Sequence, residues 1–227
     1  MAEGEVRRRR PSPERAARYL AERDAIVHAA YELIGSGQPN GASVHDILKH
    51  VGLSTRAFYR HFPSKDDLIL FMYRADSVRV TRSLEDVVAR ATTPSEALAA
   101  WVDEYLQAAY NPRKAAKARV LSSVEASSVP GFSDVFKEEM DKQRATVQVV
   151  LEEGLRDGSF PYADPEEDSY ALHALVCSYL SARLFGDRTV SLATARDHTV
   201  KLFMRGLGCT QDAPKAGKDR PGRRRAS

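Results

Sequence analysis

The stretch Ser43–Lys65, SVHDILKHVGLSTRAFYRHFPSK, has the pattern of two short amphipathic helices joined by a turn at Gly52. Apolar residues recur at helical spacing on both sides of this turn, so each helix is expected to bury one face. Gly52 suits the left-handed backbone that ends the first helix, and Ser54 has a side chain that can cap the second. The apolar residues are Val44, Ile47, Leu48 and Val51 before the turn, and Leu53, Ala57, Phe58 and Phe62 after it. The pattern predicts a helix-turn-helix, a motif that lays its second helix in the major groove of DNA.

The outward face of the second helix carries polar, cationic and hydroxyl-bearing side chains. They are Thr55, Arg56, Tyr59, Arg60 and His61. Arginine can bind guanine through two hydrogen bonds, and threonine can contact either base type. Tyr59 and His61 suit phosphate oxygens, as do Ser43 at the start of the first helix and Lys65 just beyond the second. The alternative is an ordinary solvated helix face. Charge alone favours that alternative, whereas the glycine turn, serine cap and aromatic pattern together favour a DNA interface.

The same stretch resembles the DNA-binding end of TetR-type repressors. Val51–Ser54 resembles the turn of that family, and residues 58–68, FYRHFPSKDDL, resemble the end of its second helix and the start of the next helix. The close match covers about a quarter of the chain, and the rest resembles the family in length and helical layout. The resemblance implies phosphate contacts by Tyr59, His61 and Lys65, base contacts by Thr55 and Arg56, and positions near the DNA backbone for Ser43 and His45.

Two departures from the family pattern bear on the DNA sequence that would be recognised. Leu48 stands where a small alanine is common, and Arg56-Ala57-Phe58 replaces the usual combination of glycine, threonine and leucine. These changes leave the expected fold intact, but they make the operator sequence unpredictable from the resemblance.

Composition and charge narrow the class of protein. With 227 residues of which 43% are hydrophobic, the chain can bury a sizeable core in one or two domains. No apolar run approaches the roughly 20 residues that span a bilayer, and no apolar segment follows the basic run Arg7–Arg10 as in a secretory signal. Two cysteines, Cys177 and Cys209, are too few for a disulfide framework, so we expect reduced thiols in a cytoplasmic protein. Redox sensing by Cys209 is a weaker alternative.

The positive charge lies at the two ends of the chain. Residues 1–18 carry six Arg against three Glu, and residues 211–227 carry six Lys or Arg against two Asp. Because the net charge of the whole chain is +3, the residues between the ends have a net charge of −4. A body of that charge does not coat nucleic acid indiscriminately, which argues for a focused docking surface. Arg7–Arg10 could contact a minor groove or phosphates, or could be a solvated tail.

Helical spacing continues along the whole chain, and no convincing period-2 alternation occurs. The pattern predicts an all-α fold of about nine helices, a three-helix head with the helix-turn-helix followed by a helical bundle. The resemblance implies that this bundle serves ligand binding and dimerisation. Expected bounds are residues 13–35, the two short helices, 65–90, 94–110, 112–127, 132–156, 165–185 and 192–207. The expected divisions are a disordered basic arm 1–14, the DNA-binding domain 15–63, the ligand-binding and dimerisation domain 64–208, and a disordered basic tail 209–227.

The last two helices carry more apolar surface than one core-facing stripe requires. Residues 170–185 are apolar almost all round, and the last helix has stripes at Leu192, Ala195 and Leu202 and at Val200, Phe203 and Leu207. The resemblance implies that these helices pair with their copies in a homodimer, as a four-helix bundle. Twofold symmetry would match a palindromic operator in double-stranded DNA. The alternative is one monomeric core that covers both faces.

A set of aromatic and polar residues could line a pocket between the long fourth helix and the dimer helices. The predicted ligand-binding residues are Trp101, Tyr105, Arg119, Ser122, Phe136, Tyr170 and His173. In the layout of the TetR family such a pocket binds an effector, here expected to be an apolar or amphipathic small molecule. For each single aromatic residue, core filling is the more frequent role, and a core position is also the more frequent role of His173.

No pattern of catalytic or metal-binding residues occurs. The chain lacks Cys-x-x-Cys, His-Glu-x-x-His, Gly-x-Ser-x-Gly and a glycine-rich phosphate loop, so no enzyme activity, cofactor or metal is predicted. The resemblance implies a regulator, with repression as the default of the family, released from its operator by a small molecule. An all-helical small-molecule carrier and an enzyme with a diffuse site, neither binding DNA specifically, are the alternatives.

Overall fold

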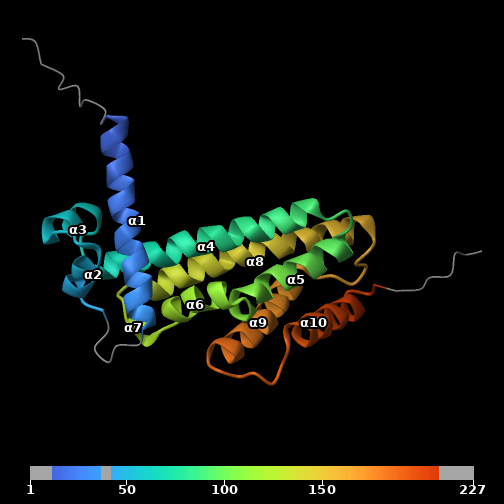
Figure 1. Ribbon diagram of the computed structural model, residues 1–227. Helices are drawn as coiled ribbons and strands as arrows, with labels where there is room; N and C mark the ends of the chain where they lie inside the picture. The colour runs from blue at the N-terminus through green and yellow to red at the C-terminus, as the bar shows by residue number, and fades with distance from the viewer. Residues whose placement is uncertain (1–11, 37–41, 210–227) are drawn as a thin grey trace, which may run out of the picture.

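The computed structural model describes residues 12–36 and 42–209, which form ten α-helices and no strand (Figure 1). All nine expected helices are present. The bounds are α1 Pro13–Gly35, α2 Val44–Val51, α3 Thr55–His61, α4 Lys65–Arg90, α5 Pro94–Tyr110, α6 Pro112–Leu121, α7 Val124–Ser127, α8 Phe132–Asp157, α9 Pro165–Leu184 and α10 Leu192–Gly206.

Two expected boundaries differ. The helix expected over residues 112–127 is divided into α6 and α7, because Ser123 adopts an extended backbone and its hydroxyl accepts a hydrogen bond from the amide of Ala126 at 3.3 Å. Pro13 and Glu14 form the first turn of α1, capped by Ser12, so the predicted arm 1–14 is wrong at its last two residues. The remainder of that arm, with Arg7–Arg10, and the tail from residue 210 lie outside the described residues.

The helix-turn-helix is fixed by local chemistry. Gly52 ends α2 with φ +66° and ψ +28°, the left-handed conformation that glycine adopts without strain. Ser43 and Asp46 cap the start of α2 reciprocally, each side chain bonding to the other residue's backbone. The side chain of Ser54 accepts a hydrogen bond from the amide of Ala57 at 3.3 Å and so starts α3. The turn between the two short helices therefore depends on Gly52 and on the cap by Ser54, while Ser43 and Asp46 fix the start of α2.

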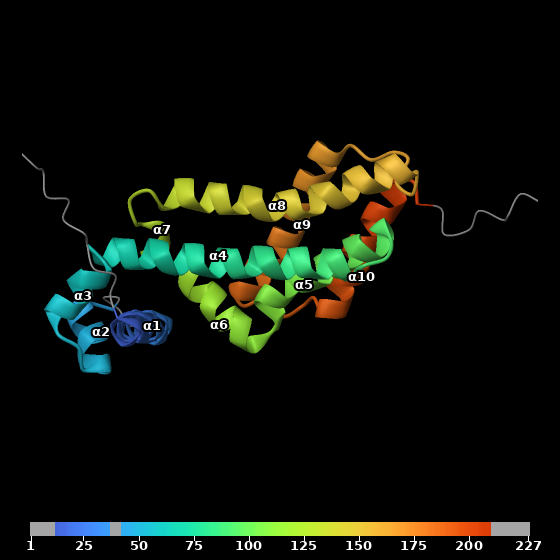
Figure 2. The same ribbon diagram turned by 90° about the horizontal axis from the view of Figure 1, so that it is seen from above.

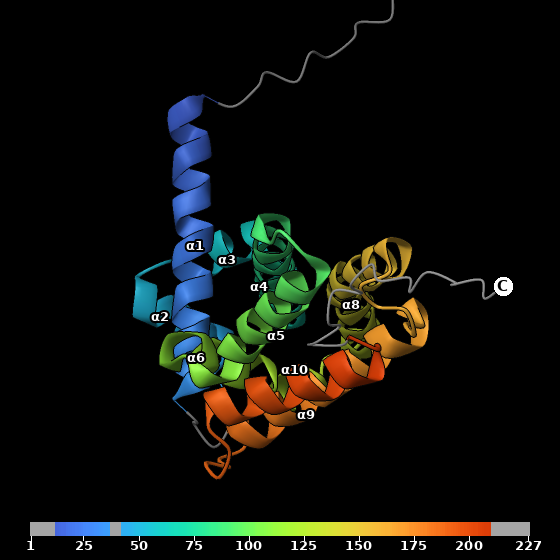
Figure 3. The same ribbon diagram turned by 90° about the vertical axis from the view of Figure 1, so that its right-hand side faces the viewer.

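The molecule is elongated, with the head α1–α3 at one end and α4 and α8 running side by side along the body (Figures 1 and 2). Seen from the other end, α9 and α10 cover one side of α5 (Figure 3). Two apolar clusters lie along this body. The first joins the head to the beginning of α4 and to α6, α7 and the start of α8, and the second joins the rest of α4 to α5, α8, α9 and α10. The core of the head therefore continues into the body.

A group of buried polar side chains lies in the second half of the molecule. The hydroxyl of Tyr105 is 2.6 Å from Gln143 Oε1 and 2.8 Å from His173 Nε2. The neighbouring Trp101 has no exposed surface and donates its indole N–H to Thr146 Oγ1 at 2.7 Å. Burial lowers the pKa of His173 from 6.5 to about 4; the positive charge of Arg144 adds to this effect and Asp141 opposes it. His173 is thus a neutral core histidine at pH 7.

We expect Gly52→Ala to lower the free energy of unfolding by about 1–2 kcal/mol, because an L-residue is strained in the left-handed conformation. A matched control is Gly206→Ala, since Gly206 ends α10 in helical geometry and an added Cβ would meet nothing within 4 Å. That change should leave stability unchanged or raise it by up to about 1 kcal/mol. Urea denaturation followed by circular dichroism measures both, and equal effects of the two substitutions would contradict the role of Gly52.

We also expect acid to destabilise the fold through His173. The unfolded chain takes up a proton at the ordinary pKa of 6.5, whereas the folded chain resists it until about pH 4, so stability falls as pH drops through this window. The full contribution is about 3 kcal/mol. His173→Gln should lose less stability than the wild type between pH 7 and pH 4.5 in urea titrations. His28→Gln, at a position 76% exposed, is the control, and identical pH dependence in all three proteins would exclude His173 as the cause.

Candidate nucleic-acid interface and small-molecule pocket

The helix α3 presents a row of polar side chains to solvent. Ala57 and Phe58 are buried on one face, and Thr55, Arg56 and Tyr59 are exposed on the other, with 57% of Tyr59 accessible. A hydroxyl, a guanidinium and a phenol thus stand on one exposed surface of a short helix. This combination can donate hydrogen bonds to base edges and to phosphate oxygens.

The last two residues of α3 are held by α1. Arg60 forms an ion pair with Glu22, and His61 Nε2 lies 3.4 Å from the same carboxylate. The ring of His61 also packs on Tyr19, with 4.2 Å between ring centroids. Partial burial opposes ionisation of Glu22, but the hydrogen bonds from His61 and Arg18 and the charge of Arg60 outweigh it, so the pKa of Glu22 lies below its usual value.

This arrangement buries the side chain of one predicted DNA contact, His61. The side chain of His61 has no exposed surface, whereas a phosphate contact requires an accessible ring nitrogen. In this arrangement His61 offers no ring nitrogen to a phosphate, and its ring packs between α1 and α3. The side chain of Arg60 remains 49% exposed despite its ion pair, so it can still meet an anion.

The predicted backbone contacts lie at the two ends of the motif. Ser43 and His45 are exposed at the start of α2, and the hydroxyl of Ser43 is also engaged with Asp46 Oδ2 at 2.5 Å. Lys65 begins α4 and forms an ion pair with Glu125 of α7. The contact between Lys65 and Glu125 links the end of the helix-turn-helix to the body, a role that the sequence did not indicate.

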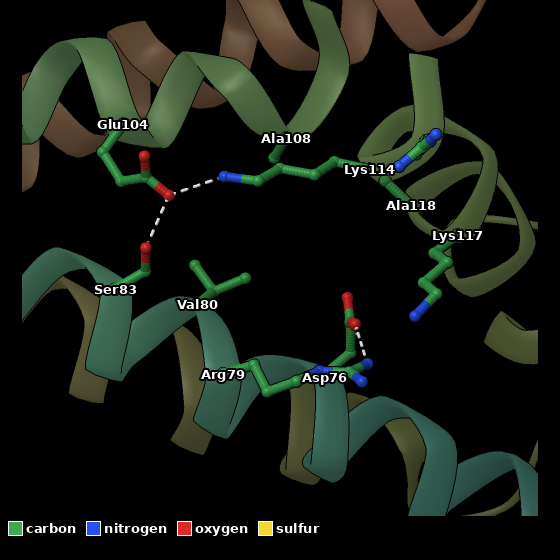
Figure 4. A pocket seen from close by; sticks show the side chains of 10 residues that line it. Asp76, Arg79, Val80, Ser83, Glu104, Ala108, Lys114, Lys117 and Ala118 are labelled. Atoms are coloured by element: carbon green, nitrogen blue, oxygen red, sulfur yellow. Dashed lines mark hydrogen bonds and ion pairs between the residues drawn. The ribbon is translucent and has the colours of Figure 1, made fainter. Parts of the chain in front are cut away.

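An open pocket of about 370 Å³ lies between α4, α5 and α6 (Figure 4). Its apolar lining comes from Val80, Ala108 and Ala118, and its polar lining from Asp76, Arg79, Ser83, Glu104, Arg113, Lys114 and Lys117. Four cationic residues thus outnumber two carboxylates. Lys114 Nζ and Ser83 Oγ each lie 2.6 Å from Glu104 Oε1, and Arg79 pairs with Asp76. Such a pocket suits a ligand with an apolar part and a negative group.

None of the seven predicted ligand-binding residues lines this pocket. Trp101, Tyr105 and His173 lie close together, but they are packed in the buried polar group described above. Phe136 and Tyr170 are exposed by 46% and 67%, and Arg119 and Ser122 are exposed near the end of α6. The sequence feature that could have indicated this pocket is the group of basic residues Arg113, Lys114 and Lys117 at the start of α6. The sequence alone does not show that this group lies opposite α4.

The last two helices expose apolar side chains on the outside of the molecule. Tyr170 in the second turn of α9 and Phe185 just after the end of α9 are exposed by 67% and 79%, and Leu202 of α10 is exposed by 50%. Between them α9 exposes the small residues Ala174, Ser178 and Ala182. Exposed aromatic and aliphatic residues on neighbouring helices are typical of a surface that another protein covers.

Metal-binding clusters and membrane-spanning helices do not occur in residues 12–36 and 42–209. No group of three or more His, Cys, Asp or Glu in these segments could hold a metal ion. None of their helices combines the length and apolar character that crossing a membrane requires. Cys177 and Cys209 are both free thiols.

Comparison of the sequence with known families gives a match over the helix-turn-helix. The sequence model described as bacterial regulatory proteins, tetR family, matches residues 26–71. The HTH-type transcriptional regulator PksA of Bacillus subtilis (strain 168) is 31% identical over 74 residues, which are 33% of this chain and 36% of PksA. The chain therefore aligns with about a third of the length of that relative.

Comparison with solved structures extends the likeness to most of the chain. FadR from Bacillus halodurans has a TM-score of 0.70 at 18% identity, covering 89% of this chain and 100% of that one. FadR from Bacillus subtilis in complex with stearoyl-CoA has a TM-score of 0.69 at 16% identity, covering 81% and 98%. At identities of 16% and 18%, the similarity to these structures shows the fold alone. Residues 26–71 are thus similar to the tetR family of bacterial regulatory proteins, and the described chain shares the fold of these solved structures.

Proposed function

We propose that the protein is a transcriptional repressor that binds a palindromic DNA operator as a homodimer and is released by a small-molecule effector. The observation that carries the DNA-binding part is the exposed row Thr55, Arg56 and Tyr59 on a helix whose other face is buried. Thr55 and Arg56 read bases, while Tyr59, Ser43, His45 and Lys65 contact the backbone. Residues 15–63 form the DNA-binding domain and residues 64–208 the domain for effector binding and dimerisation.

The dimer forms through α9 and α10. The apolar residues exposed on these two helices support this assignment, since a copy of the same surface would cover them. A twofold axis would place the two copies of α3 about 34 Å apart or at a multiple of that distance, which is the spacing of successive major grooves on one side of a duplex.

The effector binds in the pocket between α4, α5 and α6. The basic and apolar residues that line that pocket favour an amphipathic molecule with a negative group, and FadR from Bacillus subtilis was solved with such a molecule, stearoyl-CoA. Arg113 and Lys117 are the cations that we assign to the negative group, because Arg79 and Lys114 already pair with carboxylates across or beside the pocket.

Contacts between the pocket and the head support coupling of the two sites. Lys117 lies over the ring of Tyr31 in α1, with Nζ 5.5 Å from the ring centroid. The hydroxyl of Tyr31 in turn donates a hydrogen bond to the carbonyl oxygen of Met72 in α4 at 3.3 Å. An effector that draws Lys117 into the pocket would alter the contact between α6 and α1. Typical coupling free energies between two sites are about 1–3 kcal/mol.

Arg56→Ala should relax base preference in a selection from random duplexes, at a cost of about 1–3 kcal/mol at one base position. Lys65→Ala should instead weaken binding to all sequences and make the log–log salt dependence shallower by about 0.9 per phosphate that is no longer neutralised. Glu125→Gln is the matched control for Lys65, because it breaks the same ion pair but keeps the cation. If Lys65→Ala changed the preference at one base position and Arg56→Ala weakened binding to all sequences, the roles assigned to the two residues would be reversed. Absence of any specific duplex for the wild type would favour a carrier or an enzyme.

Effector binding is tested with a panel of fatty acids and acyl-CoA thioesters, measured by thermal shift and by release of labelled operator DNA. The paired change Arg113→Gln and Lys117→Gln should weaken the most potent ligand about tenfold or more, because charge-assisted hydrogen bonds are removed. Arg82→Gln, an exposed cation elsewhere on α4, should leave it unchanged. A ligand that releases wild-type protein and the paired variant at equal concentrations would place the effector site elsewhere.

A further inference from the structure

The first half of α1 extends beyond the core of the head. None of residues 13–25 is buried, and the buried face of α1 begins at Ile26. At 1.5 Å per residue this segment is about 20 Å long, and it projects past α3 in two perpendicular views (Figures 1 and 3). A projecting helix with so little apolar contact gains little stability from its own packing, which raises the question of what it contacts.

The projecting segment and α3 enclose a groove with a volume of about 420 Å³. Four of its lining residues come from α1, namely Arg15, Arg18, Tyr19 and Glu22, and the fifth is Arg60 at the end of α3. Three guanidinium groups thus face one carboxylate.

The carboxylate of Glu22 does not neutralise the groove. Arg18 Nε lies 3.1 Å from Glu22 Oε1, and Arg60 pairs with the other oxygen. Both arginines keep exposed surface, 82% of the side chain for Arg18 and 49% for Arg60. Arg15 is exposed and forms no ion pair with any residue that the structure describes. One carboxylate therefore orders two arginines while a net positive charge remains for an external anion.

The groove is continuous with the exposed face of α3. Arg60 directly follows Tyr59 in the sequence, and the hydroxyl of Tyr19 lies 3.5 Å from the carbonyl oxygen of Arg60. An anion bound by Arg15 and Arg18 would thus lie beside whatever α3 contacts. Guanidinium groups match the geometry of phosphate oxygens through paired hydrogen bonds.

We propose that Arg15, Arg18 and Arg60 form a second phosphate-binding surface, which contacts the DNA backbone flanking the base pairs read by α3. The inference rests on the DNA-binding function proposed above and extends the footprint of the protein beyond the helix-turn-helix. In this arrangement Glu22 is a positioning residue that aims Arg60 at the backbone, and Arg60 takes no part in base reading.

The test uses the full-length protein and two duplexes derived from the sequence that the wild type selects. One duplex ends at the selected base pairs, and the other carries about ten additional base pairs of arbitrary sequence on each side. Affinity is measured by fluorescence anisotropy over a range of salt concentrations. The variants are Arg15→Gln alone, which leaves the ion pairs of Glu22 intact, and Arg15→Gln with Arg18→Gln. Arg156→Gln at the end of α8, far from the head, is the control (Figure 1).

We expect the double variant to bind the long duplex several-fold more weakly than the wild type, and the short duplex equally well. Its log–log salt dependence on the long duplex should be shallower by about 0.9 for every phosphate that the variant leaves unneutralised. Arg15→Gln should show part of this effect and Arg156→Gln none.

Three results would overturn the proposal while leaving the proposed function intact. They are a wild type that binds the longer duplex no more tightly, variants that match the wild type on both duplexes, and an equal weakening on both duplexes, which would indicate that α3 had merely loosened. A wild type that selects no duplex at all would overturn the proposed function, and this inference with it.

Discussion

Burial of Phe58 holds the reading helix in place, and the rest of the arrangement depends on it. Seven residues are too few to form a stable helix alone, so α3 depends on Phe58, which is packed in the apolar cluster of the head. Phe58 has no exposed surface. Once that side is buried, the geometry of a helix directs Thr55, Arg56 and Tyr59 to solvent. The ion pair of Arg60 with Glu22 and the contact of the His61 ring with Tyr19 then set how α1 lies against α3.

The features that the sequence predicted are those decided by neighbouring residues. Helix ends follow from serine, threonine and aspartate caps, prolines in first turns and Gly52, so nearly all bounds agree within one or two residues. The division at Ser123 was missed because its capping bond interrupts a stretch whose composition is otherwise helical. The outward face of α3 was predictable for the same local reason, since its apolar spacing is visible in seven residues.

The features that the sequence did not predict depend on residues far apart along the chain. Glu22 and His61 are 39 positions apart, and nothing in the sequence shows that their helices cross at that point. The pocket likewise needs α4, α5 and α6 to be placed relative to one another before Arg79 and Lys117 share a lining. The ligand-binding residues were predicted from aromatic side chains such as Trp101 and Tyr105. In the structure these large side chains are core residues, and their hydrogen bonds are formed inside the protein.

The position of Trp101 has a practical consequence. It is the only tryptophan of the chain, it lies in the second apolar cluster, and its indole is hydrogen-bonded away from water. Its intrinsic emission therefore reports on the environment of one half of the molecule, whereas tyrosine signals come from both halves. If the tryptophan emission maximum stays blue-shifted while the helical signal in far-ultraviolet circular dichroism declines, the head is unfolding while the body remains folded. No added label is needed for this measurement.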